Sequence, residues 1–284
     1  MPFIKHVSKF LSGYSSMIAV CIISICIAYL VWVKYIPHTS IEEYTPKYMR
    51  TLQDQKYKVV VFDFDETLGH FVQLSDVIYL METIKMRNLK SNEYGMLFYL
   101  FPKYLRPEIV KILKFLGEMK RKKRCKIMVF TNNQGGKKWV RNILNAIENY
   151  INEPDLFDKI VNTYAIGREI IEKCRTSHDK IYEEFLTCTK LPQNTKVIFI
   201  DDVLHPKMDN DHVTYIHVDP YIHKYTKSEI FQTLITFRQL DQRKRTELYN
   251  ILPHVRGTIN TKEKIYNDKN IGDRLHNIIR SELQ

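Results

Sequence analysis

The sequence is poor in cysteine and glycine, and it contains no internal repeat. Five of its 284 residues are cysteines, and none of them forms a Cys-x-x-Cys pair. An odd and scattered set argues against both a disulfide framework and a zinc site, so we expect reduced thiols in a domain that faces the cytosol. We attribute the low count of nine glycines to the composition of the genome rather than to function.

Acidic residues are also in short supply. The chain has 43 lysines and arginines against 32 aspartates and glutamates, which gives a formal net charge of +11 and a pI near 9.2. A basic chain favours anionic partners such as membrane surfaces, nucleic acid or phosphoproteins, and charge alone does not choose among them. Hydrophobic residues make up 44% of the chain, which is enough for a core. The length allows one domain of about 150–200 residues with appendages.

Charge is absent from the apolar residues 17–33. This run is at the short end of a membrane span, and aromatic residues suited to the membrane interface gather at one end of it. A buried helix would carry a polar stripe, and a cleaved signal peptide would be followed by an Ala-x-Ala-like site; neither pattern is found. We therefore expect an uncleaved transmembrane anchor at residues 17–36, between a polar segment (1–16) and a polar linker (37–56). Flanking basic residues are nearly balanced, so the positive-inside rule leaves the orientation open.

Three short apolar segments each end in polar residues of catalytic types. Residues 59–62 are followed by Asp63 and Asp65, residues 126–130 by Thr131 and Asn132, and residues 197–200 by Asp201 and Asp202. Such segments are typical of buried strands in a parallel sheet, and helices between them would bring their carboxyl ends to one edge. Ligands bind at that edge in open α/β sheets. Packing does not explain the convergence of these residues, so we expect a catalytic site there.

The rest of the chain offers the elements that such a sheet needs. We expect further strands at residues 96–101, 157–164 and 213–218. We expect helices in five places: one capped by Ser75, one opened by Arg106-Pro107, one at 137–149, one opened by Lys180, and one at 227–238. Residues 271–283 have helical apolar spacing, and docking on the domain is preferred there over the binding of a partner.

The ordered set of polar residues resembles the four motifs of the haloacid dehalogenase (HAD) superfamily of phosphotransferases. The matching residues are Asp63-Phe64-Asp65-Glu66-Thr67, Thr131, Lys180 and Asp201-Asp202. Within that superfamily the sequence is similar to the phosphatases of the RNA polymerase II C-terminal domain, including membrane-anchored Dullard-type members. Residues Asp63 to Leu68, Tyr104-Leu105-Arg106-Pro107 and Lys180-Ile181-Tyr182 carry this similarity.

The resemblance implies a Rossmann-like, three-layer α/β domain with a parallel sheet at residues 57–240. Residues 69–104 would be a small insertion in place of a large cap, and residues 241–284 a charged helical tail. Two departures from the family pattern leave questions open. The family usually has Asp-Asn where this chain has Asp201-Asp202, and the segment before Lys180 is longer than usual, so Lys173 is an alternative to Lys180.

Roles for individual residues follow from the resemblance. Asp63 would attack phosphorus and form an aspartyl-phosphate, while Asp65 would act as general acid and then as general base. Thr131, Asn132 and Lys180 would hold the phosphoryl oxygens. Mg²⁺ would be held by ligands from Asp63, Asp65, Asp201 and Asp202, and Asp201 would either bind the ion or orient Lys180. Glu66 is expected to serve the turn rather than the chemistry.

The small insertion predicts an open site, and an open site favours a phosphoprotein with phosphoserine or phosphothreonine over a small metabolite. Two rival functions are a catalytically silent, membrane-anchored scaffold and a nucleic-acid 3′-phosphatase. The complete set of acidic residues argues against the scaffold, since a scaffold has no need of all of them. The sequence also lacks a clear aromatic and basic groove for nucleic acid, so nucleic acid is not the expected partner.

The basic run at residues 120–124 precedes a predicted strand, so it is expected at the edge of the sheet opposite the active site. The linker from the predicted anchor enters the domain at that same edge. This arrangement suggests contact with anionic lipid and hence a cytosolic catalytic domain, because the cytosolic leaflet is the anionic one. A solvated turn is an equally good interpretation of the run.

Overall fold

The computed structural model describes residues 58–85, 87–256 and 262–284, all of which belong to one compact unit. The predicted anchor (17–36) and linker (37–56) lie outside these residues. Among the helices that are described, none combines the length and the apolar character needed to cross a membrane.

Five parallel strands form the central sheet in the order β3-β2-β1-β6-β7. They are β1 (Lys58–Phe62), β2 (Cys125–Phe130), β3 (Lys159–Val161), β6 (Lys196–Asp201) and β7 (Val213–His217). Phe62 at the end of β1 pairs with Val129 on one side and Ile200 on the other, so the three predicted strand ends are level. The expected strand at 157–164 is the short edge strand β3.

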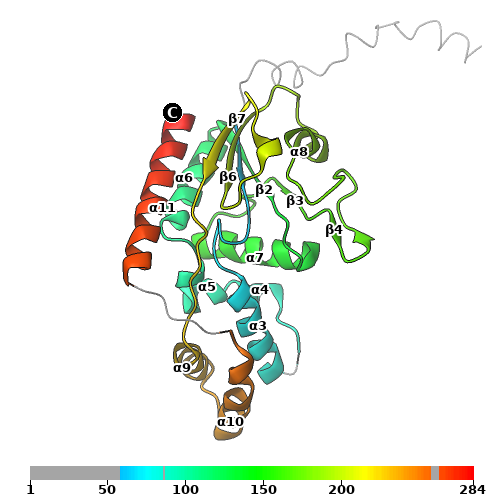
Figure 1. The fold of residues 1–284 in the computed structure, drawn as a ribbon. Coiled ribbons are helices and arrows are strands. Elements are labelled where there is room, and N and C mark those ends of the chain that lie inside the picture. The colour runs from blue at the N-terminus through cyan, green and yellow to red at the C-terminus, as the bar shows by residue number, and fades with distance from the viewer. Residues whose placement is uncertain (1–57, 86, 257–261) are drawn as a thin grey trace, which may run out of the picture. The chain divides into compact units, whose positions relative to one another are not determined.

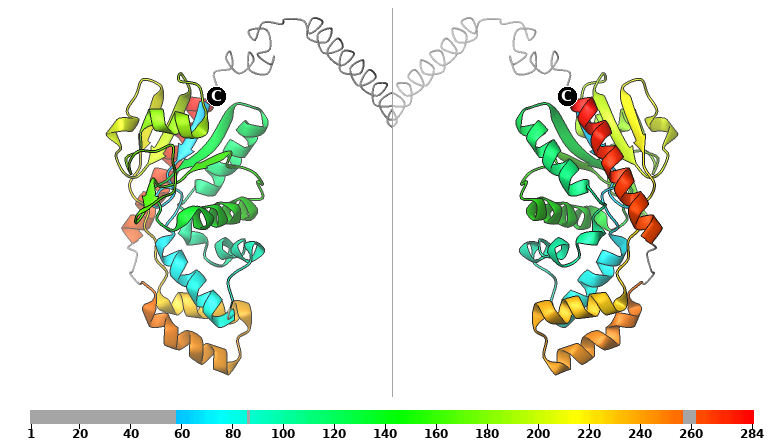
Figure 2. Two further views of the ribbon diagram at one scale, coloured as in Figure 1. Left: turned by 90° about the vertical axis from the view of Figure 1, so that its right-hand side faces the viewer. Right: turned by 90° about the vertical axis from the view of Figure 1, so that its left-hand side faces the viewer.

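Helices cover both faces of the sheet (Figure 1, Figure 2). Alternate residues of β1 point to opposite faces: Val60 and Phe62 join one apolar core, whereas Val59 and Val61 join another. The first core contains side chains of α6 (Ile109–Arg121), α7 (Gly136–Ile151) and α11 (Lys262–Leu283), and the second contains those of α8 (Tyr182–Thr189). The predicted three-layer α/β arrangement is therefore confirmed.

The insertion is a small group of helices that joins the first core. It contains α3 (Val72–Lys85), α4 (Ser91–Tyr94), α5 (Leu97–Leu100) and the 3₁₀ turn η1 (Pro102–Tyr104). Helices α4 and α5 pack on α7, and α3 packs on α10 (Gln242–Ile251), which follows α9 (Lys227–Arg238). Two hairpin strands, β4 (Ala165–Ile166) and β5 (Glu169–Ile170), lie outside the main sheet.

The prediction of a strand at 96–101 was wrong, because these residues form α5 and the turn that follows it. Leu97, Phe98 and Phe101 are buried while Tyr99 is exposed, which is the spacing of a helical face. A short, continuously apolar run does not reveal by its periodicity whether it forms a helix or a strand. Helix α3 also starts earlier than expected, at Val72, which places Ser75 within its first turn.

The C-terminal helix docks on the domain, as its apolar spacing predicts. Leu275, Ile279 and Leu283 of α11 are buried, and the helix packs against α6. Figure 2 shows the two helices side by side on the same face of the sheet. At its end, the Glu282 carboxylate forms an ion pair of 2.9 Å with Lys58 at the start of β1.

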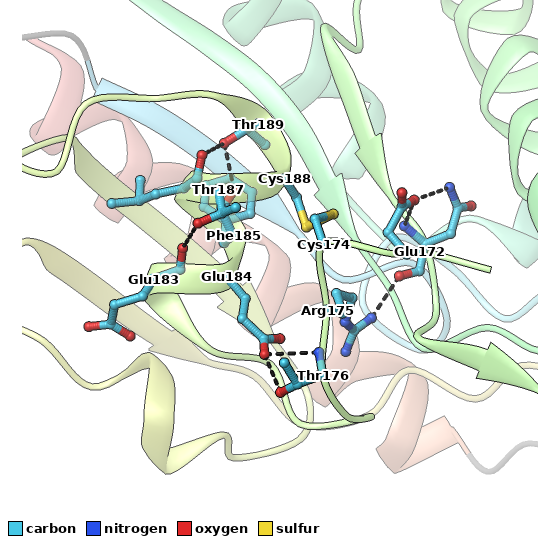
Figure 3. The surroundings of a disulfide bond; sticks show 12 residues. Glu172, Cys174, Arg175, Thr176, Glu183, Glu184, Phe185, Thr187, Cys188 and Thr189 are labelled. Atoms are coloured by element: carbon cyan, nitrogen blue, oxygen red, sulfur yellow. Dashed lines mark hydrogen bonds between the residues drawn. A yellow bond between two sulfur atoms is a disulfide. The ribbon is translucent and has the colours of Figure 1, made fainter. Parts of the chain in front are cut away.

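The expectation of reduced thiols was wrong for two of the cysteines. Cys174 and Cys188 form a disulfide with a Cα–Cα distance of 5.2 Å (Figure 3), which is within the usual range. Cys174 lies in the segment before α8 and Cys188 in the last turn of that helix, so the chain folds back between them. Spacing in the sequence does not reveal such a return. Cys125 is buried and free, and Cys21 and Cys26 lie outside the described residues.

Candidate active site

The three level strand ends surround a cavity of about 400 Å³ at one edge of the sheet. Residues from four separate stretches of the chain meet there, and most of them are acidic or polar. They are Asp63, Asp65, Glu66, Thr131, Asn132, Asn133, Gln134, Lys180, Asp201, Asp202, Val203 and His205. Every predicted site residue is in this set, so the structure brings together the side chains that the sequence separates by more than a hundred positions.

Asp63 lies directly after β1 and is 8% exposed. Its backbone NH donates a hydrogen bond of 2.8 Å to the carbonyl of Ile200, which continues the sheet by one residue. Its Oδ1 accepts a hydrogen bond from the ammonium group of Lys180. Burial raises the pKa of Asp63, and the positive charge of Lys180 opposes that rise. A cation in the same cavity would favour the ionised carboxylate further.

Asp65 is held by a residue that the sequence interpretation missed. The side-chain amide of Asn133 donates a hydrogen bond of 2.6 Å to Asp65 Oδ2. Asn133 is itself held in place, because its Oδ1 accepts from the NH of Gly135 at 2.8 Å and its NH donates to Thr131 Oγ1 at 2.9 Å. Burial raises the pKa of Asp65 to about 6, and the Asn133 hydrogen bond limits the rise. This carboxyl group can therefore both give and take a proton near neutral pH.

Lys180, rather than Lys173, enters the site. Its side chain is buried, and its Nζ donates to Asp63 and, at 2.6 Å, to Asp201 Oδ2. Lys173 is exposed and is not among the residues that line the cavity. The other oxygen of Asp201, Oδ1, accepts from the NH of Val203 at 2.9 Å. Asp201 is thus bonded on both oxygens and fixes the lysine between two carboxylates.

Asp63, Asp201 and Asp202 form a cluster in which one carboxylate oxygen from each residue lies within 4.8 Å of the others. Asp202 is half-buried, burial raises its pKa, and its Oδ1 accepts a hydrogen bond of 2.7 Å from Thr67 Oγ1. A set of closely spaced carboxylate oxygens fits a small, hard divalent cation such as Mg²⁺. The carboxylate of Asp65 is not in this cluster and accepts a hydrogen bond from Asn133, which agrees with the expectation that Asp65 would offer its backbone carbonyl to the ion.

Asn132 and Glu66 also line the cavity, but their hydrogen bonds are made with the surrounding loops. The side chain of Asn132 is bonded outside the cavity: its Nδ2 donates to the carbonyl of His178 and its Oδ1 accepts from Arg175, both at 2.8 Å. Glu66 has a left-handed φ of 61°, and its NH donates a hydrogen bond of 2.7 Å to Gly69 O, so it shapes the turn after Asp65. This agrees with the structural role expected for Glu66.

Arg106 holds the turn that follows Asp65 by hydrogen bonds to its backbone. Its side chain is 1% exposed, and its Nε donates to the carbonyl of Thr67 at 2.7 Å. Its Nη2 donates to the carbonyls of Glu66 at 2.5 Å and Asp219 at 2.7 Å. The arginine before the α6 helix therefore holds the backbone of the acidic loop.

Comparison with known protein families identifies the domain. The family model described as NLI interacting factor-like phosphatase matches residues 58–247, which is more than half of the chain. The chain belongs to the NLI interacting factor-like phosphatase family. This confirms the predicted relationship to the Dullard-type and C-terminal-domain phosphatases of the HAD superfamily, and it supports phosphatase activity. No curated protein matches the chain.

All residues that line the cavity lie within the part that matches the NLI interacting factor-like phosphatase family, whereas α11 lies beyond it. Asn133, Arg175 and His205 were not predicted as site residues from the sequence. Asn133 directly follows Asn132, and nothing in the sequence distinguishes the two. Arg175 and His205 lie outside regular elements and depend on tertiary contacts for their positions.

Proposed function

We propose that this chain is a Mg²⁺-dependent phosphatase that acts through an aspartyl-phosphate on Asp63, with phosphoserine or phosphothreonine proteins as substrates. One observation carries the proposal. A buried and a half-buried carboxyl group with raised pKa values, a buried lysine and a threonine hydroxyl surround one cavity at the carboxyl ends of parallel strands. This arrangement, in a chain of a phosphatase family, supports phosphoryl transfer more directly than binding alone.

The two carboxyl groups divide the chemistry. In the first step Asp63 attacks phosphorus, the bond to the leaving oxygen breaks, and Asp65 gives that oxygen its proton. In the second step Asp65 takes a proton from water, which attacks phosphorus and releases phosphate and the Asp63 carboxylate. The pKa of about 6 for Asp65 suits both directions of proton transfer. Lys180 and Thr131, which both line the cavity, would hold phosphoryl oxygens.

The candidate cation site fits the same scheme. Mg²⁺ would be held by the carboxylates of Asp63 and Asp202 and by the backbone carbonyl of Asp65, and it would neutralise negative charge on the phosphoryl group. Asp201 is bonded on both oxygens to Lys180 and Val203, which favours the orienting role for Asp201 over the ligand role. Asp202 has one oxygen bonded to Thr67, which leaves the other available for an ion.

The surroundings of the cavity support a protein substrate. No described residue of the insertion 69–104 lines the cavity, so these helices do not close over it. Val203 and Leu204 at the rim are 55% and 63% exposed. Their loop is held by the Tyr215 hydroxyl, which donates to Val203 O at 2.8 Å and accepts from the NH of His205 at 3.1 Å. A fixed apolar rim beside a phosphate site suits the side chain next to a phosphorylated residue.

Turnover is the first test of this proposal. Hydrolysis of an aryl phosphate is measured with and without Mg²⁺ for the wild type and for Asp63→Asn, which keeps the size of the side chain and removes the nucleophile. We expect Mg²⁺-dependent turnover that Asp63→Asn lowers by about a thousandfold or more. Equal rates for the two proteins would favour the scaffold. A 3′-phosphorylated oligonucleotide hydrolysed faster than every phosphopeptide would favour the nucleic-acid phosphatase.

The rim residues test the substrate class separately. We expect Leu204→Ser to lower kcat/KM for phosphopeptides by about tenfold and to leave aryl phosphate hydrolysis unchanged, because only a peptide reaches the rim. The matched control is Tyr249→Ser, which removes another exposed apolar side chain, on α10, outside the cavity lining. Equal losses for both substrates, or turnover of a free sugar phosphate as fast as that of a phosphopeptide, would contradict a protein substrate.

A further inference from the structure

The segment between β5 and α8, residues 171–181, brings Lys180 into the active site without forming a helix or a strand. The lysine ammonium group is at the end of a long flexible side chain, so its position depends on how firmly this backbone is held. The guanidinium group of Arg175 and the Cys174–Cys188 disulfide are among the contacts that hold it.

Arg175 is 2% exposed, and its guanidinium group donates five hydrogen bonds to uncharged oxygens. They are Nη1 to Thr131 O at 3.2 Å, Nη1 to Asn162 O at 2.7 Å, Nη2 to Asn132 Oδ1 at 2.8 Å, and Nη2 to the carbonyls of His178 and Asp179, each at 3.1 Å. The group also lies over the ring of Phe130, 4.7 Å from its centre. One planar group therefore joins the end of β2, the residue after β3 and the two residues that precede Lys180.

These acceptors connect both parts of the phosphate site. Thr131, whose carbonyl binds Arg175, contributes its hydroxyl to the cavity, and Asp179 is covalently next to Lys180. The guanidinium group thereby joins the backbone that carries the hydroxyl to the backbone next to the residue that carries the ammonium group. Burial lowers the pKa of Arg175 to about 10, so the group is still charged at neutral pH and all five hydrogen bonds are charge-assisted.

The disulfide fixes the other side of the same segment. It joins Cys174, the neighbour of Arg175, to Cys188 in α8, and it closes a ring of the chain that contains Lys180 (Figure 3). Close by, the NH and hydroxyl of Thr176 donate to Glu184 Oε1 at 3.0 Å and 2.5 Å. Cys188 is buried and packs in the core beneath α8, so this end of the ring is firmly anchored.

We propose that Arg175 is a positioning residue that sets the place of Lys180 relative to Thr131, and that the Cys174–Cys188 disulfide holds Arg175 in that position. The inference rests on the proposed function for the phosphate-binding roles of Lys180 and Thr131. A displacement of about 1 Å in such a group can cost about a hundredfold in rate. Loss of either restraint should therefore raise the inhibition constant of phosphate even at temperatures where the protein remains folded.

Variants of Arg175 in the full-length chain test the first part. Arg175→Lys keeps the charge but does not reach five acceptors, and Arg280→Gln removes an exposed charge on α11 as a control. The readouts are the inhibition constant of inorganic phosphate, KM and kcat for an aryl phosphate, and the thermal midpoint. We expect Arg175→Lys to raise the phosphate inhibition constant and KM by about tenfold or more at temperatures where the protein is folded, and Arg280→Gln to change neither.

A double-mutant cycle shows whether Arg175 acts through Lys180. We expect Lys180→Met to weaken phosphate binding, and Arg175→Lys to add little in the Lys180→Met background because the group that it positions is gone. Fully additive losses, or a folded Arg175→Lys protein with wild-type phosphate affinity, would overturn the positioning role. A wild type that binds no phosphate would overturn the proposed function together with this inference. Phosphate binding that is normal in the wild type and in Arg175→Lys would overturn this inference alone.

Reduction of the disulfide tests the second part. A dithiol such as dithiothreitol gives two electrons and two protons to the Cys174–Cys188 bond, which becomes two thiols while the reagent becomes its own cyclic disulfide. We expect the reduced wild type and Cys174→Ser/Cys188→Ser to bind inorganic phosphate several-fold more weakly than the oxidised protein. Dithiothreitol should not change the double variant, and Cys125→Ser, at the buried free cysteine, should keep the response. Equal phosphate affinity before and after reduction would overturn the role of the disulfide.

Discussion

The Asp65 carboxyl group gives and takes a proton in the proposed reaction, and two neighbouring features set its pKa in opposite directions. Burial raises the pKa to about 6, and the hydrogen bond from Asn133 lowers it by stabilising the carboxylate. The leaving oxygen needs the protonated form, so kcat/KM should fall as pH rises through this pKa. We therefore expect the Asn133 side chain to influence the pH range of the proposed reaction through its hydrogen bond to Asp65.

Removal of the Asn133 side chain should shift the pH at which kcat/KM declines on the alkaline side. In Asn133→Ala the carboxylate loses a stabilising hydrogen bond, so the pKa of Asp65 rises and the alkaline decline of kcat/KM shifts upward by about one pH unit. The control is Gln134→Ala, since Gln134 lines the same cavity but donates to Asn132 O and Thr163 Oγ1. A profile of Asn133→Ala that coincides with that of the wild type would show that another group controls this decline.

At pH values above its pKa, the ionised Asp65 carboxylate should also lower the free energy of unfolding. Its folded-state pKa is raised from 3.8 to about 6, so the folded protein holds the proton more tightly, and stability falls as pH rises from about 4 through 6. Asp65→Asn should therefore raise the free energy of unfolding at pH 7.5 by at most about 3 kcal/mol, with a much smaller gain at pH 4.5. Denaturation in the presence of a chelator at both pH values measures this. An equal effect of the substitution at the two pH values would argue against burial of a charged carboxylate as the cause.

At the scale of elements, the contact between α11 and the start of α6 depends on a glycine. A Cβ atom at Gly272 would overlap the carbonyl oxygen of Pro107 and would lie 3.0 Å from the Cβ of Glu108. These residues directly follow Arg106, which holds the backbone of the acidic loop. Helix α11, which lies outside the part that matches the family, therefore packs closely against the two residues that follow Arg106.

Gly272→Ala should destabilise the protein although alanine is the better helix former. Overpacking at such a contact costs about 1–3 kcal/mol, which exceeds the gain of about 1 kcal/mol in helix propensity. Asn277→Ala on the exposed face of α11 is the matched control and should be neutral or slightly stabilising. Chemical denaturation compares the two variants. If Gly272→Ala is as stable as Asn277→Ala, the close approach does not require glycine.

At the scale of the whole molecule, the basic run 120–124 and the active site lie at opposite edges of the sheet, because the run precedes β2 and the site follows it. Part of this charge is used within the domain: Lys120 forms an ion pair of 3.0 Å with Asp158, and Arg121 pairs with Glu153. Lys122, Lys123 and Arg124 are exposed. These three residues are the ones that we propose to face anionic lipid.

Charge reversal tests this orientation. In the compact unit Lys56–Gln284, Lys122→Glu/Lys123→Glu should weaken binding to phosphatidylserine vesicles and should leave aryl phosphate hydrolysis unchanged. Each basic residue near such a surface contributes about 1 kcal/mol at moderate salt. Arg243→Glu/Lys244→Glu on α10 makes the same change in charge elsewhere. An equal loss of vesicle binding in both variants would mean that net charge, and not this edge, causes the effect. Vesicle binding that is unchanged in Lys122→Glu/Lys123→Glu would exclude the edge as a lipid contact.

Much of the domain was predictable because its signals are local. Apolar runs mark β1, β2 and β6, and the polar site residues directly follow each run. Helices that connect parallel strands bring the carboxyl ends of the three strands to the same edge of the sheet. The strand expected at 96–101 was wrong because an apolar run of this length carries no decisive period. Asn133, Arg106 and Arg175 act through contacts with residues that are distant in sequence, and no local pattern indicates such contacts.

The order of the candidate site residues, the parallel sheet and the edge at which the site lies could be read from the sequence, since strand burial and chain connectivity depend on neighbouring residues. Three contacts became apparent in the folded chain alone: Lys180 rather than Lys173 enters the site, Asp201 binds Lys180, and Asn133 holds Asp65. The same is true of the meeting of Cys174 and Cys188. These outcomes depend on where the irregular segments settle. Hydrogen bonds and packing between elements determine those positions, and such contacts exist only after the sheet has formed.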